Sequence, residues 1–338
     1  MKGVVLAGGL GTRLLPMTKV TNKHLLPVFD RPMIYFPIQQ LVHAGIDDIL
    51  IVTGGNHAGD FLRLLGNGKE FGLRRLHYAY QEGEGGIAEA LGLAEDFSDG
   101  GPICVILGDN IFETPIREAV DAYRADPEGA MVLLKEVDHP ERFGVAELRE
   151  GRIVSIVEKP AEPISKLANI GLYYMRDRRL LFEGIAHTLA SEPGPSGEFY
   201  LTDAFQYMVD QGAKIQVAPV DGWYDCGKPE TLLDTNRYLL ERGRAGVDDS
   251  ATVEGSNLIE PVRVEDGALV MGCTLGPNVT VESRARIEGS TLVDTMVGSD
   301  AVIEWSDLRG SLVGSHSQVR AFRGQLSVVD HSEIVGGQ

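Results

Sequence analysis

The sequence predicts an α/β domain over residues 1–244, followed by a β-helix over residues 245–338. Three observations support this fold class. Strand-like stretches alternate with helical ones in the first part of the chain. A six-residue repeat of aliphatic residues runs through the second part, which is typical of a hexapeptide β-helix. Composition also changes where the two parts meet, because no lysine follows Lys228 and the aromatic residues of the tail are Trp305 and Phe322 alone.

The alternation in the first part can be followed element by element. Short apolar segments rich in β-branched residues are typical of buried parallel strands, and they occupy residues 4–7, 49–52 and 104–107. Helical stretches are expected at residues 33–44, 87–97, 116–124, 203–210 and 230–241. Gly45 follows the first helix as a C-cap, and residues 130–175 are expected to form mostly strands. The pattern predicts one mixed sheet whose parallel strands are joined by right-handed crossovers.

The tail follows a segment, residues 241–246, that has the composition of a linker. Each turn of a β-helix places an aliphatic residue in a narrow interior that excludes bulky aromatic rings. A small β-sandwich is the alternative, but its strands would recur about every 8–12 residues, whereas the observed period is six. The repeat becomes irregular after Asp307. Its clearest copies are residues 251–256, 279–284, 285–290 and 301–306.

Charge and cysteine content exclude several classes of protein. The formal net charge of −18 disfavours binding to nucleic acid, whose phosphates such a surface repels. No apolar run is long enough to span a bilayer, and residues 1–9 are interpreted as a first strand rather than a signal peptide. The sequence has three cysteines and no CxxC motif. This argues against a zinc site or a disulfide framework and favours a reducing, cytoplasmic setting.

The strongest motif is the glycine-rich segment at residues 6–16, directly after the first strand. Glycines allow backbone N–H groups to approach phosphate oxygens closely. The segment lacks the third glycine of a dinucleotide-binding fingerprint and the GK[ST] of a P-loop. Arg13, Lys19 and Lys23 add local positive charge to a chain that is otherwise acidic. A small anionic substrate is therefore expected here.

Residues 8–37, with Lys23–Val28 and Arg31–Pro37 as their clearest motifs, resemble the sugar-phosphate nucleotidyltransferases. Within that family the chain is most similar to long-form members that transfer a thymidylyl group to glucose 1-phosphate. The resemblance covers roughly residues 1–240. It implies a Rossmann-like nucleotidyltransferase domain, a left-handed β-helix tail, and a Mg²⁺-dependent reaction that releases pyrophosphate from dTTP.

The resemblance also implies which residues hold the nucleotide. Glycines and Thr12 would surround the triphosphate, while Arg13 and Lys23 would be catalytic because they neutralise its charge. Gln81 would read the thymine or uracil edge, since an amide offers both a donor and an acceptor, and Gly86 would contact the base through its backbone. The complete nucleotide-binding set is Leu6, Gly8, Gly9, Gly11, Thr12, Arg13, Gln81, Gly86 and Asp109.

The resemblance assigns Mg²⁺ to Asp109, which follows an apolar strand, and to Asp225. Carboxylate oxygens suit this hard cation. The sugar phosphate would be bound by Gly144, Glu158, Lys159, Asn169 and Glu198.

The chain departs from the family at Ser196, where an arginine usually helps to hold the sugar phosphate. Arg142 and Lys166 are the candidates for compensating this loss.

Three alternatives remain open. The chemistry could be the same with UTP or with another sugar phosphate. The protein could be a non-catalytic regulatory subunit that binds sugar nucleotides. The tail could also carry an acyltransferase activity that uses His316 or His331, although no acid, base and nucleophile converge in its motifs. The long faces of a β-helix favour a closed homo-oligomer.

Overall fold

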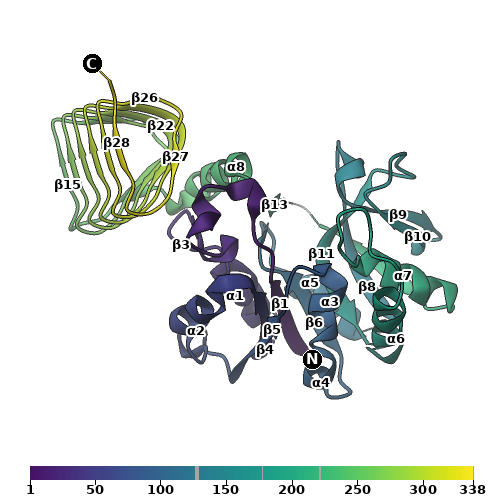
Figure 1. Cartoon of the computed structure of the whole chain (residues 1–338). Coiled ribbons are helices and arrows are strands. Elements are labelled where there is room, and N and C mark those ends of the chain that lie inside the picture. The colour runs from purple at the N-terminus through teal and green to yellow at the C-terminus, as the bar shows by residue number, and fades with distance from the viewer. Residues whose placement is uncertain (126–128, 177, 221, 338) are drawn as a thin grey trace. The chain divides into compact units, whose positions relative to one another are not determined.

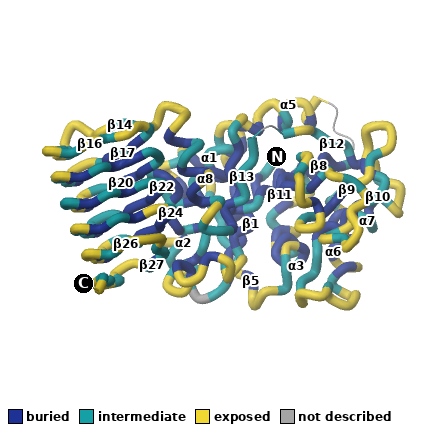
Figure 2. Tube along the Cα trace, turned by 90° about the horizontal axis from the view of Figure 1, so that it is seen from above, coloured by how far each residue is buried: buried dark blue, intermediate teal, exposed yellow. Residues whose placement is uncertain are grey.

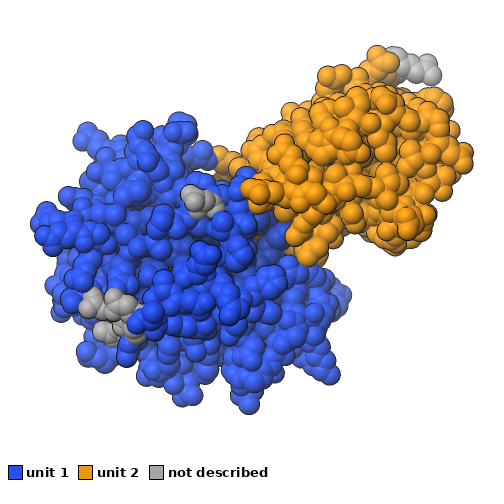
Figure 3. All heavy atoms as spheres, turned by 180° about the vertical axis from the view of Figure 1, so that it is seen from behind, with its two compact units in different colours: residues 1–10, 34–224 blue, residues 11–33, 225–338 orange. Residues whose placement is uncertain are grey.

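The computed structural model describes residues 1–125, 129–176, 178–220 and 222–337, which form two compact units (Figure 3). One unit consists of residues 1–10 and 34–224, and the other of residues 11–33 and 225–338. The domain boundary at residue 244 stays a prediction, whereas the compact units place residues 11–33 with the C-terminal part. In the described parts of the chain, every helix is too short or too polar to cross a membrane.

The first unit is built on a nine-stranded mixed sheet (Figure 1). The order of its strands is β5-β4-β1-β6-β11-β8-β12-β10-β9. Strands β5, β4, β1 and β6 run parallel, whereas β11 runs antiparallel to both of its neighbours. The predicted mixed sheet is therefore confirmed. The strands are β1 (Lys2–Ala7), β4 (Asp48–Gly54), β5 (Arg75–Gln81), β6 (Ile103–Leu107), β8 (Ala130–Glu136), β9 (Gly144–Arg149), β10 (Arg152–Glu158), β11 (Leu167–Met175) and β12 (Ile215–Pro219).

Helices flank this sheet, and the central strands are its most deeply buried part (Figure 2). The apolar faces of α3, α6 and α7 pack together over one core cluster that includes Val4, Val105 and Phe205. The helices are α1 (Tyr35–His43), α2 (Ala58–Leu65), α3 (Gly86–Gly92), α4 (Glu95–Ser98), α5 (Arg117–Ala125), α6 (Arg178–Leu189) and α7 (Leu201–Asp210). A separate two-stranded sheet joins β7 (Asn110–Phe112) to β13 (Trp223–Asp225).

Two local predictions in this unit can be compared with the structure. The C-cap at Gly45 is confirmed: its φ is 74°, and the Ile46 N–H donates to the Leu41 carbonyl at 3.0 Å, as in a Schellman turn. The single helix predicted at residues 87–97 is wrong, because α3 ends at Gly92 and α4 begins at Glu95. The Ala94 N–H closes a tighter turn on the Leu91 carbonyl at 2.9 Å, which interrupts the helix.

The tail of the second unit is a stack of coils made of short parallel strands (Figure 1). One of its faces has the strand order β15-β18-β21-β23-β25-β28. The strands are β14 (Gly246–Val247), β15 (Thr252–Glu254), β16 (Asn257–Leu258), β17 (Val262–Val264), β18 (Leu269–Met271), β19 (Thr274–Leu275), β20 (Val279–Val281), β21 (Arg286–Glu288), β22 (Thr291–Val297), β23 (Val302–Glu304), β24 (Asp307–Val313), β25 (Gln318–Arg320), β26 (Arg323–Gly324), β27 (Ser327–Val328) and β28 (Glu333–Val335).

Aliphatic residues stack in register from one coil to the next, as the repeat predicts. One column consists of Val253, Val270, Ile287, Ile303, Val319 and Ile334. A second consists of Leu258, Leu275, Leu292 and Leu308. Pairing continues beyond Asp307 to β28, so the coils extend past the point where the repeat becomes irregular. Trp305 lies outside the stack, with two thirds of its surface (66%) exposed, which agrees with an interior too narrow for an aromatic ring.

The linker predicted at residues 241–246 is wrong. The helix α8 (Pro229–Leu239) continues into a wide helical turn at Leu240–Arg244, which ends where Gly243 adopts a φ of 82°. Gly246 and Val247 then already pair with β17 of the stack. Glycine in this segment therefore lets the chain change direction sharply, since glycine adopts positive φ at little cost.

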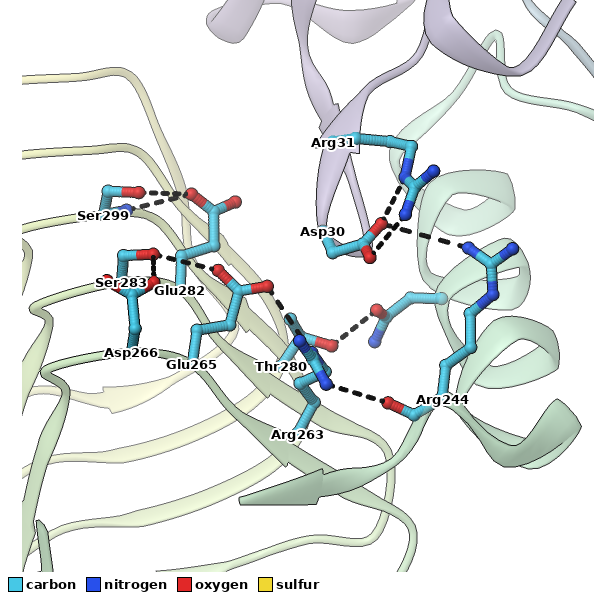
Figure 4. A network of polar contacts seen from close by, with 11 residues as sticks. Asp30, Arg31, Arg244, Arg263, Glu265, Asp266, Thr280, Glu282, Ser283 and Ser299 are labelled. Atoms are coloured by element: carbon cyan, nitrogen blue, oxygen red, sulfur yellow. Dashed lines mark hydrogen bonds and ion pairs between the residues drawn. The ribbon is translucent and has the colours of Figure 1, made fainter. Parts of the chain in front are cut away.

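Residues 11–33 form short 3₁₀ turns at Thr12–Leu14, Met17–Lys19 and Lys23–Leu25, followed by the small hairpin of β2 (Pro27–Val28) and β3 (Arg31–Pro32). Figure 4 shows how polar residues connect this hairpin to the tail. Asp30 pairs with Arg31 at 2.6 Å, and its Oδ1 lies 4.0 Å from Arg244 Nη1. The Arg244 carbonyl in turn accepts from the Arg263 guanidinium at 3.5 Å.

A small cavity of about 30 Å³ also lies between residues 17–27 and the coils. Its lining is mostly apolar but includes the half-buried carboxylate of Glu282. Ser299 donates to the Glu282 Oε2 from its N–H at 3.0 Å and from its hydroxyl at 2.9 Å. Burial raises the pKa of Glu282 to about 7, and the nearby Glu265 and Asp330 raise it further, against the effect of Ser299. In the second unit, mostly apolar residues thus line the space between residues 17–27 and the coils, with the Glu282 carboxylate hydrogen-bonded to Ser299 beside them.

Candidate active site

In the first unit, the glycine-rich segment begins at the buried carboxyl end of β1. The Gly108 N–H donates to the Leu6 carbonyl at 2.9 Å, which brings the end of β6 beside it. Carboxyl ends of parallel strands are where ligands bind in open α/β sheets. A Cβ atom on Gly8 would lie 2.5 Å from the Gln81 Oε1, so a side chain at position 8 would displace this amide. The structure therefore brings Gly8 and Gln81 together, two residues after Leu6.

Gln81 is the last residue of β5 and is almost fully buried. Its Nε2 donates to the Gly86 carbonyl at 3.1 Å and to the Glu89 Oε2 at 2.7 Å. Gly86 has a φ of 91°, and a Cβ there would lie 2.6 Å from the Phe199 carbonyl oxygen. The sequence indicated Gln81 and Gly86 but missed Glu89, which reaches the amide from the first turn of α3.

In the second unit, Gly11 and Lys23 are in close contact. Gly11 has a φ of 67°, and a Cβ on it would lie 2.7 Å from the Lys23 Cβ. The Thr18 hydroxyl donates to the Gly11 carbonyl at 2.8 Å, which fixes the turn that begins at Thr12. Glycine is required here both by the left-handed backbone and by the approach of the lysine stem.

Arg13 and Asp225 both approach Gly227 in the same unit. A Cβ on Gly227 would be 2.9 Å from the Arg13 Nη2 and 2.9 Å from the Asp225 Oδ1. The Gly227 N–H donates to that same carboxylate oxygen at 3.1 Å. The absence of a side chain at position 227 thus leaves room for a guanidinium and a carboxylate to lie side by side.

Asp109 in the first unit follows β6, and only 8% of its surface is exposed. Its neighbour Asn110 donates to the Ile170 carbonyl and accepts from the Trp223 Nε1 at 3.1 Å, which fixes the turn. Over the described ranges, no three His, Cys, Asp or Glu side chains gather closely enough to hold a metal ion. The carboxylates of Asp109 and Asp225 suit Mg²⁺, which usually takes its remaining ligands from water and substrate phosphates.

The residues predicted to bind the sugar phosphate come together in the first unit. A Cβ on Gly144 would lie 2.8 Å from the Glu158 Oε2 and 3.7 Å from the Asn169 Cβ. Lys159 Nζ lies 3.8 Å from the Glu158 Oε1 and 3.9 Å from the Glu198 Oε2. The Asn169 side-chain amide donates to the Tyr173 hydroxyl at 2.9 Å, and this hydrogen bond orients it. The result is one ammonium flanked by two carboxylates.

Burial raises the pKa of Glu158 above its ordinary value, while Lys159 and the hydroxyl of Thr202 act in the opposite direction. Thr202 donates to the Glu158 Oε2 at 3.2 Å. Lys159 itself has a φ of 41°, which is uncommon for a residue with a side chain. Such backbone strain often marks functional positions.

Ser196, which replaces the expected arginine, is part of the same cluster. Its hydroxyl donates to the Glu198 Oε2 at 3.0 Å and lies 2.7 Å from the Tyr200 hydroxyl. The Tyr200 ring centroid is 5.1 Å from the Lys159 Nζ, at the distance of a cation–π contact. Within the described residues, neither Arg142 nor Lys166 has a side-chain hydrogen bond or ion pair to this cluster. Tyr200, to which the sequence assigned no role, instead contacts Ser196 and Lys159 in this cluster.

The two histidines of the tail are adjacent. The rings of His316 and His331 stack with centroids 4.8 Å apart and planes 8° from parallel. Both residues have positive φ, at equivalent corners of successive coils. The regular geometry of the coil corners thus accounts for the pair.

Residues 2–242 match the nucleotidyl transferase family, and the chain belongs to that family. The predicted resemblance is confirmed by similarity to glucose-1-phosphate thymidylyltransferases. The chain is 41% identical to that of Neisseria meningitidis over 243 residues, which is 71% of this chain and 82% of the relative. It is 33% identical to the enzyme of Streptomyces antibioticus over 339 residues, which is 94% of this chain and 93% of the relative.

Two solved structures share the fold. A Bacillus anthracis protein described as a glucose-1-phosphate thymidylyltransferase, solved with sucrose, is 44% identical with a TM-score of 0.63. The match covers 70% of this chain and 94% of the Bacillus anthracis chain. A UDP-glucose pyrophosphorylase in complex with UDP-glucose is 26% identical with a TM-score of 0.60, covering 71% and 98%.

Proposed function

We propose that the protein transfers a thymidylyl group from dTTP to glucose 1-phosphate, giving dTDP-glucose and pyrophosphate. The observation that carries this proposal is the similarity to a glucose-1-phosphate thymidylyltransferase along 94% of the chain. The buried Gln81 amide supports a pyrimidine base with an imide edge, because it presents an oxygen acceptor beside Gly8. The cluster around Lys159 supports a phosphorylated sugar, since a cation and two carboxylates match a phosphate and hydroxyl groups.

In this reaction an oxygen of the sugar phosphate attacks the α-phosphorus of the triphosphate in line, and pyrophosphate leaves. No protein nucleophile is needed, so catalysis consists of positioning and of neutralising spreading negative charge. We assign the charge neutralisation to Arg13 and Lys23, and the binding of the sugar phosphate to Lys159. Glu158 and Glu198 would accept hydrogen bonds from sugar hydroxyls. The glycines at positions 8, 9 and 11, with Thr12, would surround the triphosphate.

We propose that Asp109 and Asp225 supply carboxylate ligands to Mg²⁺, which would offset phosphate charge when bound. The chemistry of the two side chains fits this ion. Their substitution should therefore alter Mg²⁺-dependent nucleotide binding as well as turnover. Isothermal titration of nucleotide with and without Mg²⁺ separates these two effects.

The decisive experiment measures pyrophosphate release from a matrix of dTTP, UTP, ATP and GTP with several sugar 1-phosphates. The proposal expects the highest kcat/KM with dTTP and glucose 1-phosphate. Equal rates with GTP would contradict the assignment of Gln81 to the base. UTP is the second candidate, because the structural relative with bound UDP-glucose shares the fold. Sugar-nucleotide binding without turnover in any combination would favour a regulatory subunit.

We further propose that the tail is a left-handed β-helix that stabilises the enzyme and supports a homo-oligomer. Its stacked aliphatic columns and the packing of residues 17–27 against it support a structural role. Light scattering of the purified protein measures the oligomeric state. Acylation of a sugar nucleotide that depends on His316 or His331 would contradict this role.

A further inference from the structure

We infer that Glu89 determines base selectivity by fixing which end of the Gln81 amide faces the nucleotide. The inference rests on the proposed function, because it assigns the base to Gln81. Glu89 is a positioning residue in this scheme, since it acts through another side chain. Nothing in the sequence pattern indicated this role.

The geometry shows two acceptors converging on one nitrogen. Gln81 Nε2 donates to the Glu89 Oε2 at 2.7 Å and to the Gly86 carbonyl at 3.1 Å, so both of its hydrogens are used. The Gln81 Oε1 lies on the other side, toward Gly8, where it accepts no hydrogen bond from any residue that the structure describes. The amide therefore presents an acceptor at its unoccupied end.

An amide alone has no fixed direction, because its oxygen and nitrogen can exchange places by rotation about the last side-chain bond. Here the reversed orientation would place the Gln81 oxygen against a carboxylate and a carbonyl oxygen. Three acceptors would then meet without a hydrogen between them. The charge on Glu89 makes this reversal more costly than a neutral acceptor would, since hydrogen bonds to ionised groups are the stronger ones.

Both acceptors are held in place by their surroundings. The Phe199 N–H donates to the Gly85 carbonyl at 2.8 Å, and the Ala88 N–H donates to the Phe199 carbonyl at 3.2 Å. These bonds fix the backbone on either side of Gly86. The Glu89 carboxylate lies over Gly85, where a Cβ would come within 2.5 Å of it. The direction of the amide is thus set by elements that do not depend on a bound nucleotide.

An acceptor at this position favours thymine and uracil over cytosine. The imide bases carry a hydrogen on N3 that can be donated to the Gln81 Oε1. Cytosine has a lone pair on N3, which would face the oxygen of the amide without a hydrogen. A reversed amide would have the opposite preference, because its NH₂ group would donate to the cytosine N3.

The test compares dTTP and dCTP binding by calorimetry, together with pyrophosphate release, in the wild-type protein, Glu89→Gln and Glu89→Ala. The glutamine variant keeps the size of the side chain but adds a donor that can stabilise the reversed Gln81. We expect it to lower the ratio of dTTP to dCTP affinity about tenfold, the size of one hydrogen bond to a charged group. Glu89→Ala, which adds no donor, should lower the ratio less. Glu84→Gln, an exposed change in the same loop, is the matched control.

The outcomes separate this inference from the proposed function. A wild-type protein that prefers dTTP through Glu89 but releases no pyrophosphate would contradict the proposed reaction and support the role of Glu89. An unchanged ratio in Glu89→Gln, or an equal loss of affinity for both nucleotides, would overturn the inference, because a merely structural residue gives that result. A wild-type protein that binds dTTP and dCTP equally, or binds neither, would overturn it as well.

Discussion

Gly8 and Gln81 lie so close together that a single added carbon on Gly8 would come within 2.5 Å of the Gln81 Oε1. A glycine in the segment proposed to bind phosphate thereby limits the position of the side chain proposed to bind the base. The two proposed parts of the nucleotide site are in direct contact at these residues. The consequence can be tested with a conservative change.

Gly8→Ala should weaken dTTP binding about tenfold, the effect of displacing one hydrogen-bonding group. The contacted atom is the end of a side chain, so we expect the fold to tolerate the change. Calorimetry gives the affinity, and thermal unfolding gives the stability. Gly59→Ala is the control, because a Cβ there meets no atom within 4 Å. Wild-type affinity in Gly8→Ala would show that the position of Gln81 is unimportant.

Gly227→Ala should reduce kcat at least about tenfold while leaving the melting temperature within a few degrees of wild type. The added methyl group would clash with both the Arg13 guanidinium and the Asp225 carboxylate and displace them. Steady-state kinetics at several Mg²⁺ concentrations measure the effect. If kcat stays normal, the arrangement of Arg13 and Asp225 around Gly227 has no part in catalysis.

Tyr200→Leu should raise the KM for glucose 1-phosphate about fivefold without changing the KM for dTTP, because a cation–π contact at a partly exposed site contributes about 0.5–1 kcal/mol. Tyr200→Phe keeps the ring over Lys159 but loses the hydroxyl beside Ser196. The KM of Tyr200→Phe for glucose 1-phosphate should therefore lie between those of the wild-type protein and Tyr200→Leu.

Tyr78→Phe serves as the control for Tyr200, because the Tyr78 hydroxyl donates to the Gly66 carbonyl at 2.7 Å and to no other residue that the structure describes. Equal increases in both KM values for Tyr200→Leu would argue for a general structural defect instead of a role at the sugar phosphate.

Glu282→Gln should flatten the dependence of stability on pH between about 5 and 7.5. In the unfolded chain this carboxyl loses its proton near the ordinary pKa of 4.5, whereas in the folded protein it retains the proton up to about 7. The folded state therefore binds more protons over this interval, and stability falls as the pH rises. The effect is at most about 3 kcal/mol.

Urea denaturation of the wild-type and Glu282→Gln proteins at pH 5, 6 and 7.5 measures this difference. The amide can still accept from Ser299, so the local hydrogen bonds are preserved. Parallel pH profiles for the two proteins would mean that Glu282 ionises normally in the folded state.

Sequence reasoning was most successful where local pattern decides the structure. The apolar strand at residues 4–7 and the columns that include Val253 and Ile287 follow directly from side-chain periodicity. It failed where backbone turns interrupt a pattern, as at Ala94 and in residues 241–246. The helix at Arg178–Leu189 was not anticipated either.

Within the site, motifs indicated residues such as Gln81 and Lys159, but not the side chains that orient them. Glu89 contacts Gln81, and Tyr200 contacts Ser196, in a geometry that depends on how α3 and the loop before α7 pack. Neither belongs to a pattern of spacing. The association of residues 11–33 with the tail was equally inaccessible, because long-range packing leaves no local signature.

That association has a consequence for how the protein is made. Residues 11–33 emerge from the ribosome early, yet the part of the chain with which they form a compact unit begins at residue 225. At about 5–20 residues per second, the wait between the two is on the order of 10–40 s. During that time the rest of its compact unit has not yet been made, so we expect the apolar side chains of the segment with Arg13 and Lys23 to stay available to chaperones. Ribosomes stalled before residue 225 should therefore carry a first sheet that is already folded and a segment, residues 11–33, that a protease can still cut.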